Sequence, residues 1–201
     1  MRIRPYESRD RSDVYDVCVR TADGGDDATG NYSTDDLMPD LFAGPYITLE
    51  PEHAFVLDDG SRVVGYVIGT TDTPRFVERY RTEWAPSLGD KYARPAPDAT
   101  DRESALLRLH FGPEHMLVRE LADYPAHLHI DLLPSAQRQG WGRRLIDTFL
   151  DALHEKNVPA VRLGMLTSNT AGRAFYDRLG FTEFLVPDAV DVTYLVRSTA
   201  R

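Results

Sequence analysis

Apolar residues near the start of the chain recur first with the period of a strand and then with that of a helix. Residues 3–6 are predicted to form a short strand. Asp10 is then placed to cap a helix whose buried face carries Val14, Val17 and Cys18. Residues 23–27 are rich in glycine and aspartate and predict a turn. Calcium binding is the alternative, although the spacing is not that of an EF-hand.

A second helix and a β-hairpin are predicted next. Residues 35–42 have a helical pattern, and Gly44-Pro45 is expected to end this helix. Two apolar segments, 53–57 and 63–70, flank Asp58-Asp59-Gly60-Ser61. A short connection that contains glycine between two such segments is typical of a hairpin.

The last third of the chain has the clearest periodicity. The expected elements are a strand at 127–133, a helix at 138–155, a strand at 160–165, a helix at 170–179 and a strand at 190–197. The first two strands should be parallel, with a right-handed crossover through the helix. The last strand is expected to carry Val190, Val192, Tyr194 and Val196 on one face.

Residues 73–125 form a long segment with weaker patterns. Six prolines punctuate it, and helices are predicted near 76–84 and 101–109. Loops of this length in compact domains are commonly lids or binding walls. We therefore expect an α/β fold with a mixed central sheet flanked by helices, and an insertion at about 73–125 that borders a ligand site.

Composition and charge narrow the possible classes of protein. A chain of 201 residues is served by one hydrophobic core, so residues 1–201 are expected to form a single domain. No apolar run is long enough to span a bilayer, and the charged start lacks the apolar core of a secretory signal, so a cytoplasmic location is expected. Cys18 is the only cysteine, which excludes an internal disulfide. The net charge of -9 argues against nucleic-acid binding.

The segment Gln137–Arg143 has the composition of a phosphate-binding turn. It lies between a predicted strand and a predicted helix and contains Gly140 and Gly142. The start of a helix has unpaired N–H groups, and glycines let an anion approach the backbone closely. The segment matches neither the P-loop nor the G-x-G-x-x-G dinucleotide pattern, so nucleoside triphosphate and nicotinamide ligands are disfavoured.

The same segment resembles the coenzyme A pyrophosphate loop of the GNAT superfamily of N-acetyltransferases. Gln137-x-x-Gly140-x-Gly142 follows Leu132-Leu133-Pro134, and the resemblance continues through Asn169 and the run from Phe175 to Phe181. From about residue 35 onward, the chain also resembles the acetyltransferase-like C-terminal domain of O-GlcNAcase and its free-standing bacterial relatives. The matching segments are Gly44-Pro45-Tyr46, Pro51-Glu52, residues 64–69 with Asp72, Trp84, Tyr92 and residues 129–134.

The resemblance implies acetyl-coenzyme A (acetyl-CoA) as the cofactor and assigns residues to it. Leu132 is expected to pair its backbone with the pantetheine arm, and Asn169 to contact this arm as well as cap the next helix. The residues implied at the cofactor are Leu132, Leu133, Gln137, Arg138, Gln139, Gly140, Trp141, Gly142, Arg143, Asn169 and Tyr176. Among the arginines, Arg138, Arg143 and Arg144 add positive charge beside the pyrophosphate, or are solvated helix residues.

The implied catalytic residues are less complete. Tyr176 is expected to protonate the departing thiolate. Many members of the superfamily carry a glutamate or histidine four or six residues before Leu132, but Leu128 and Ala126 occupy these positions here. His129 and Asp131 are the remaining candidates for a base. Together with His127, they alternate on the opposite face of an ideal strand, and only a β-bulge would turn them around; the alternative is a His–Asp pair that has only a structural role.

The predicted activity is direct acetyl transfer from acetyl-CoA to a primary amine. No His-supported cysteine or serine nucleophile is apparent in the sequence, which argues against a covalent enzyme intermediate. The acidic balance slightly favours a polyamine, an aminoglycoside-like molecule or a lysine side chain over an anionic amine. The alternative is a module that binds acetyl-CoA, or a protein partner, without turnover, because this domain of O-GlcNAcase is regarded as a pseudo-acetyltransferase. The acceptor and the oligomeric state cannot be predicted.

Overall fold

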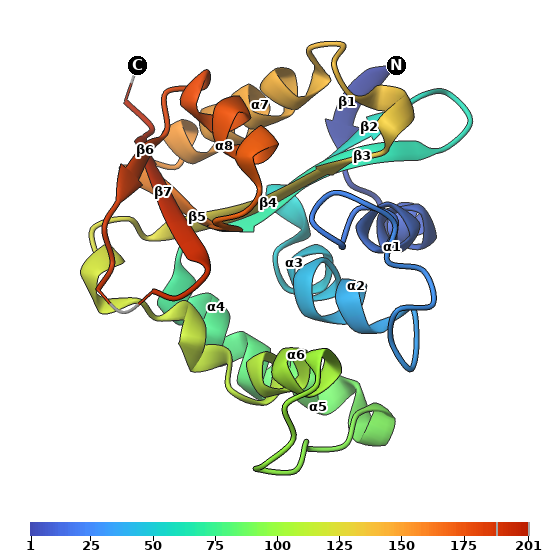
Figure 1. Cartoon of the computed structure of the whole chain (residues 1–201). Helices are drawn as coiled ribbons and strands as arrows, with labels where there is room; N and C mark the ends of the chain where they lie inside the picture. The colour runs from blue at the N-terminus through green and yellow to red at the C-terminus, as the bar shows by residue number, and fades with distance from the viewer. Residues whose placement is uncertain (188, 201) are drawn as a thin grey trace.

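A computed structural model describes residues 1–187 and 189–200, and its centre is one seven-stranded mixed sheet (Figure 1). The strands are β1 (Arg2–Pro5), β2 (Ala54–Asp58), β3 (Val63–Thr70), β4 (Ala126–Leu132), β5 (Ala160–Leu166), β6 (Thr182–Phe184) and β7 (Val192–Ser198). Their order across the sheet is β1-β2-β3-β4-β5-β7-β6. Strands β4 and β5 are parallel and the other neighbours are antiparallel. The parallel pair joined by a helix confirms the predicted βαβ unit.

Helices cover both faces of the sheet. They are α1 (Arg11–Val19), α2 (Leu37–Phe42), α3 (Gly44–Leu49), α4 (Thr73–Arg79), α5 (Ala85–Ser87), α6 (Arg102–Phe111), α7 (Trp141–Glu155) and α8 (Thr170–Asp177). Helices α7 and α8 lie on one face, and α1, α2 and α3 lie on the other (Figure 1). Helices α4, α5 and α6 of the insertion lie beyond this second group.

Helix α7 is held against the sheet by the apolar stripe that its sequence predicts. Leu145, Ile146 and Phe149 have no exposed surface, and their 3.6-residue spacing places them on one side of the helix. A β-carbon added to Gly69 of β3 would come within 2.5 Å of the Phe149 ring. Glycine at this position therefore allows the close approach of α7 to the centre of the sheet.

Several details of the predicted secondary structure are wrong. Helix α2 ends at Phe42, before Gly44-Pro45, as predicted, but proline in the first turn then starts helix α3, which was not predicted. Asp10 precedes α1, but its carboxylate does not cap this helix; it accepts hydrogen bonds from Arg4 and from the backbone N–H of Glu7. Strand β7 begins at Val192, so the exposed Val190 lies outside it. Strand β6 is too short to produce a periodic pattern.

The insertion is anchored to the rest of the chain through Asp40 of α2. Both predicted helices are present: α4 continues through a π-helical turn at Tyr80–Trp84 into α5, and α6 follows later. The Asp40 carboxylate accepts hydrogen bonds from Lys91 Nζ at 2.7 Å and from the Tyr92 hydroxyl at 2.8 Å. Trp84 donates its indole N–H to the Asp40 carbonyl at 2.9 Å. These contacts fix residues 84–92 on α2.

Predictions about membrane spans, location and the turn at 23–27 remain to be compared with the structure. No helix in the described part of the chain is long and apolar enough to cross a membrane. The cytoplasmic location stays a prediction. Residues 23–27 form turns, with hydrogen bonds in both directions between the backbones of Asp23 and Asp26 at 3.0 Å.

Candidate functional site

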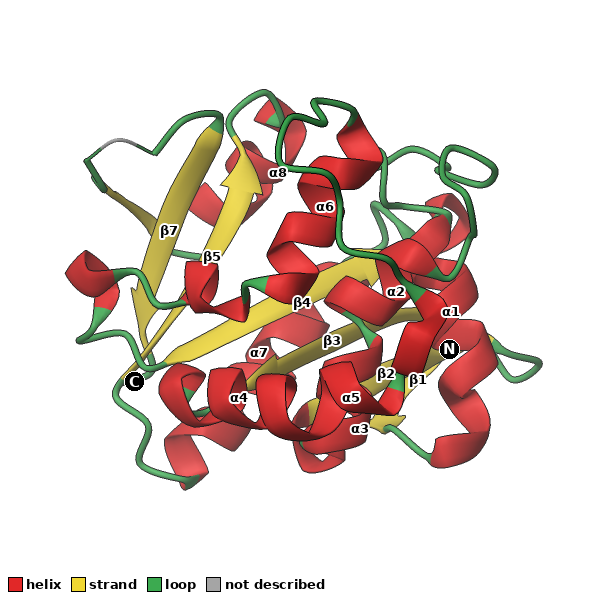
Figure 2. Cartoon of the chain, turned by 90° about the horizontal axis from the view of Figure 1, so that it is seen from below, coloured by secondary structure: helices red, strands yellow, loops and turns green. Residues whose placement is uncertain are grey.

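The two parallel strands at the centre of the sheet separate soon after they meet. Strands β4 and β5 pair only at Ala126 with Val161 and at His127 with Arg162. Strand β4 then continues to Leu132 and β5 to Leu166 without further pairing, and Figure 2 shows the two arrows diverging. Beyond His127, the side of β4 that faces β5 is therefore an open strand edge, which an extended ligand with amide groups can join.

The turn that leaves β4 ends in a cluster of backbone N–H groups. Helix α7 begins at Trp141, three residues later than predicted, because Arg138 and Gly140 adopt the left-handed conformation with φ of 59° and 83°. The first N–H groups of α7 lack partners within the helix and carry its positive dipole end. A β-carbon added to Gly140 would meet no atom within 4 Å, so the space beside the turn is open. The turn fits an anionic group such as a pyrophosphate.

Two glutamines hold this turn in place. Gln137 donates its side-chain amide to the carbonyl oxygen of Leu132 at 2.8 Å, which ties the turn to the end of β4. Gln139 donates to the carbonyl oxygen of Ser135 at 2.7 Å. The buried Leu133 donates its backbone N–H to Val64 of β3, so the strand end is also fixed.

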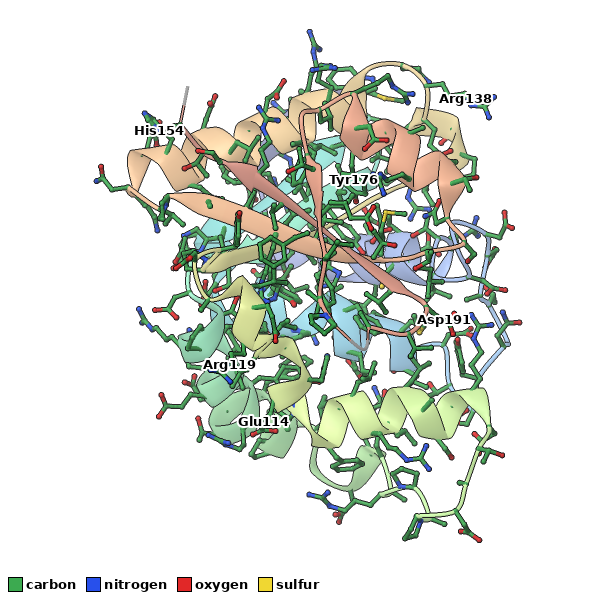
Figure 3. The ribbon with its side chains drawn as sticks, turned by 60° about the vertical axis from the view of Figure 1, so that its left-hand side comes forward. Glu114, Arg119, Arg138, His154, Tyr176 and Asp191 are labelled. Atoms are coloured by element: carbon green, nitrogen blue, oxygen red, sulfur yellow. The ribbon has the colours of Figure 1, made fainter. Side chains whose placement is uncertain are left out.

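The arginines of the turn differ in their surroundings. Arg138 is exposed at the outer end of the turn (Figure 3). Arg143 donates to the carbonyl oxygen of Arg178 at 2.9 Å, and the Arg144 guanidinium lies 4.8 Å from the centre of the Trp141 ring. Arg138 is therefore the arginine best placed to add charge beside the turn without giving up another contact.

Asn169 immediately precedes helix α8, and Tyr176 lies within it. The Asn169 side chain accepts a hydrogen bond from the backbone N–H of Gly172 at 2.8 Å and so caps this helix. Tyr176 packs edge-on against Phe175 and Phe181, with ring centres 5.1 and 5.5 Å away. Burial raises the pKa of Tyr176, and the negative charge of Asp131 raises it further. The phenol therefore stays protonated at neutral pH and can act as a proton donor.

The predicted route for turning His129 and Asp131 around is wrong. Strands β3 and β4 pair without a register shift from Gly65 with Leu132 to Thr70 with His127, so β4 contains no bulge over this stretch. The side chains keep their alternation. His129 and Asp131 face the side of the sheet covered by α1 and α3, and Leu132 faces α7.

On that face, Asp131 and His129 each bond to a tyrosine rather than to each other. The Tyr66 hydroxyl donates to Asp131 at 2.6 Å, and Tyr46 shares a hydrogen bond with His129 Nε2 at 3.1 Å. Burial raises the pKa of Asp131 to about 6 and lowers that of His129 to about 4. At neutral pH, Asp131 is thus an anion close to its titration range and His129 is a neutral imidazole.

Three further side chains lie on this face; the sequence placed only His127 there, through its alternation with His129 and Asp131, and it assigned a role to none of them. His127 is held by the Tyr46 hydroxyl at 2.6 Å and by Thr73 at 2.8 Å, so both of its ring nitrogens are occupied. Tyr66 has no exposed surface, and only the register of β3 against β4 places it beside Asp131. Arg162 lies where β4 and β5 separate; the available signal was one arginine in an otherwise apolar strand.

Comparisons with known proteins agree with this architecture. The model of the "Acetyltransferase (GNAT) family" matches residues 26–181. Protein O-GlcNAcase from Rattus norvegicus is 26% identical over 200 residues, which cover 98% of this chain but only 22% of that protein. The chain thus spans about a fifth of the length of this relative.

Solved structures show the same fold. The crystal structure of SsHAT is 53% identical, with a TM-score of 0.95, and the match covers 100% of this chain and 98% of that one. The PaiA N-acetyltransferase from Thermoplasma acidophilum, solved in complex with coenzyme A, is 12% identical with a TM-score of 0.60, and the match covers 98% of each chain. With its diverging parallel strands and its glycine-containing turn, this chain belongs to the GNAT acetyltransferase family.

Proposed function

We propose that this chain binds acetyl-CoA between β4 and β5 and transfers the acetyl group directly to a primary amine. The separation of these strands after His127 carries the proposal, because it leaves an open strand edge that leads to the N-terminus of α7. An extended ligand with amide groups and a pyrophosphate matches both features. Membership of the family supports an N-acetyltransferase kind of activity.

Each part of the cofactor has a proposed set of residues. Leu132 and Leu133 offer backbone groups to the pantetheine arm, and Asn169 contacts it from α8. The pyrophosphate lies against the backbone of residues 138–143, with Gln137 holding the turn and Trp141 packing beside it. The whole chain, residues 1–201, acts as one domain in this proposal, and residues 73–125 form a wall of the acceptor site.

Two side chains handle protons in the proposed reaction. Bound acetyl-CoA supplies the thioester carbon that the amine attacks. Tyr176 donates its phenolic proton to the departing sulfur, since burial keeps this group protonated. Asp131 takes the proton from the amine, because a pKa of about 6 leaves it ionised yet basic. His129, with a pKa of about 4, is the weaker candidate for the base.

Calorimetric titration with acetyl-CoA tests the binding step. Arg138→Glu reverses the charge of an exposed side chain beside the turn and is expected to weaken binding about tenfold or more. Arg119→Glu makes the same charge change on an exposed residue of the insertion, far from Arg138 (Figure 3), and serves as the matched control. This pair is cleaner than a Gly142 variant, since a β-carbon there would lie 3.0 Å from the Phe175 ring.

The outcome separates specific binding from general attraction. Micromolar binding by the parent chain and by Arg119→Glu, with weaker binding by Arg138→Glu, supports the proposed pyrophosphate site. Equal weakening in both variants means that net charge rather than this turn determines affinity. No binding by the parent chain contradicts the proposed function.

One observation favours a second candidate, a module that binds acetyl-CoA without turnover. Ala126 and Leu128 are apolar, and they are 0% and 3% exposed, so they supply no base. Release of free thiol from acetyl-CoA in the presence of primary amines distinguishes the candidates. An enzyme releases thiol in proportion to amine and loses this activity in Tyr176→Phe, whereas a module binds acetyl-CoA and releases none.

A further inference from the structure

Arg162 is a buried cation without a counter-ion. Its exposed fraction is 6%, and it pairs with His127 across β4 and β5 at the point where the strands separate. No carboxylate among residues 1–187 and 189–200 forms an ion pair with it, and its Nε has no hydrogen-bond partner. By contrast, Arg4, which is also largely buried, pairs with Asp10 and Asp58. Arginine does not deprotonate, so the positive charge stays at this point of the fold.

The groups around Arg162 do not neutralise this charge. Its Nη2 donates to the carbonyl oxygen of Met116 in the insertion at 2.5 Å, which satisfies one of five N–H donors. The phenols of Tyr194 and Tyr46 are the groups that favour its charged form. His127 is neutral, because burial lowers its pKa well below the usual range. A charge left in such a setting is costly unless an anion joins it.

The surface beside Arg162 is open toward the proposed acceptor site. Two residues further along β5, Gly164 is exposed, and Leu166 is 48% exposed. Tyr194 pairs with Gly164 and is only half-buried. A molecule lying on this part of β5 therefore passes from the exposed end of the strand to the guanidinium.

Asp131 is the complementary charge on the same face. Neighbouring residues of paired strands share a face, and positions four apart along β4 do too, so Asp131, His127 and Arg162 point to one side. No cation contributes to the pKa of Asp131, whose carboxylate accepts a hydrogen bond from the Tyr66 hydroxyl. The two unpaired charges are separated along β4 by roughly 13 Å of strand, four residues at about 3.3 Å each.

We propose, on the basis of the proposed function, that the acceptor is a primary amine that also carries a carboxylate several bonds away, and that Arg162 binds this carboxylate. The amine lies near Asp131 and Tyr176, where the acetyl group is transferred. The planar guanidinium can donate two parallel hydrogen bonds to one carboxylate. This acceptor differs from the cationic amine that the net charge of the chain favours, because the unpaired Arg162 sets the local charge.

Matched acceptors test the proposal. The rates of acetylation of 6-aminohexanoate and 6-aminohexanamide are compared at one ionic strength. These compounds share the amine and the chain length and differ in the carboxylate. The parent chain is expected to favour the carboxylate about ten- to hundredfold in kcat/KM, the effect of one charged bidentate contact. Shorter acceptors such as 3-aminopropanoate should show a smaller preference, since they cannot reach both charges.

Variants of Arg162 identify the residue responsible. Arg162→Gln keeps a polar amide but removes the charge, and it is expected to bring the ratio of the two rates close to one while acetyl-CoA affinity is unchanged. Arg162→Lys keeps the positive charge but cannot donate two parallel hydrogen bonds to one carboxylate, so it should retain part of the preference. Equal rates for both acceptors in the parent chain, or a preference that persists in Arg162→Gln, would overturn the proposal.

A readout without turnover separates this proposal from the proposed function. Ligand-detected NMR titration measures binding of the acetylated product 6-acetamidohexanoate and of its amide, with no acetyl-CoA present. Binding of the carboxylate that is lost in Arg162→Gln supports the carboxylate site even if no acetylation occurs. Acetylation without any difference between the two products contradicts the carboxylate site and leaves the proposed function intact.

Discussion

Gln137 donates its side-chain amide to the carbonyl oxygen of Leu132, so the turn before α7 is tied to the last residue of β4. These two segments have different proposed tasks, since β4 lines the separation of the strands and the turn faces the pyrophosphate. The bond therefore fixes the position of the turn relative to the end of β4. Gln139 makes a comparable bond, but only within the turn, to Ser135.

Replacing Gln137 should therefore weaken acetyl-CoA binding. Gln137→Met removes the bond at similar volume and is expected to raise the Kd about fivefold, the effect of one net hydrogen bond of about 1 kcal/mol. Gln139→Met serves for comparison and should have a smaller effect, because it does not link the turn to β4. Calorimetry measures both. An equal or larger effect of Gln139→Met would mean that internal order of the turn matters more than its link to the strand.

Tyr176 is expected to affect the chemical step and not the binding of the cofactor. Tyr176→Phe removes the phenolic proton and keeps the ring between Phe175 and Phe181. We expect kcat to fall about a hundredfold or more, with an unchanged Kd for acetyl-CoA. Tyr6→Phe is the control, since Tyr6 follows β1 at the edge of the sheet, outside the residues assigned to the cofactor and the acceptor. A Tyr176→Phe variant with the parent rate would show that the thiolate leaves without this donor.

Most of the fold was predictable because strong periodicity marks its central unit. The stripe of α7 is long and fully buried on one side, so its 3.6-residue period is clear in the sequence. Helix α3 and strand β6 were missed, since six and three residues are too short for a period to appear. In the sequence, Pro45 indicates the end of the preceding helix, but proline is equally suited to the first turn of a new helix.

The candidate site was predictable where it depends on local sequence and not where it depends on register. The turn at Gln137–Arg143 is one contiguous motif, so its position followed from the pattern. The partnership of Tyr66 with Asp131 depends on how β3 aligns with β4, which no single segment encodes. The isolation of Arg162 likewise follows only from what surrounds it in three dimensions.

The pH dependence of turnover distinguishes the two candidate bases. Asp131, with a pKa of about 6, must be ionised to accept a proton, so kcat/KM should fall about tenfold per pH unit below 6. If His129 is the base, the fall should begin near pH 4. The profile is measured with one amine across pH 4.5 to 8. Asp131→Asn should remove the limb near 6 along with most of the activity.

Asp131 should also lower stability above its titration range. Its pKa is raised from 3.8 to about 6 in the folded chain, so the folded state holds the proton more tightly than the unfolded state. Stability is therefore lost as pH rises from about 4 to 6, by about 3 kcal/mol for a shift of about two units. Asp131→Asn cannot ionise and still accepts from Tyr66.

Urea unfolding at two pH values measures this effect. Relative to the parent chain, Asp131→Asn should be nearly neutral at pH 4 and more stable by up to about 3 kcal/mol at pH 7.5. The pH-dependent contributions of other groups cancel in this difference. A difference that does not change with pH would mean that Asp131 ionises as easily in the folded chain as in the unfolded one.

The anchoring of the insertion rests on the pair formed by Lys91 and Asp40. Asp40 is 1% exposed and Lys91 is its cationic partner, while Tyr15 and Tyr92 donate neutral hydrogen bonds to it. Removing one member of a buried pair leaves the other charge uncompensated. Because Lys91 is one-third exposed and two phenols remain, Lys91→Met should lower the free energy of unfolding by about 2 kcal/mol, less than the loss expected for a fully buried pair.

The control is Arg119→Met, on an exposed residue, which should change the free energy of unfolding by no more than about 0.5 kcal/mol in the same urea titration. If Lys91→Met is equally neutral, the phenols alone stabilise Asp40. If it is costly, hydrogen exchange should also speed up in residues 84–92, as expected for a wall that this pair holds against α2.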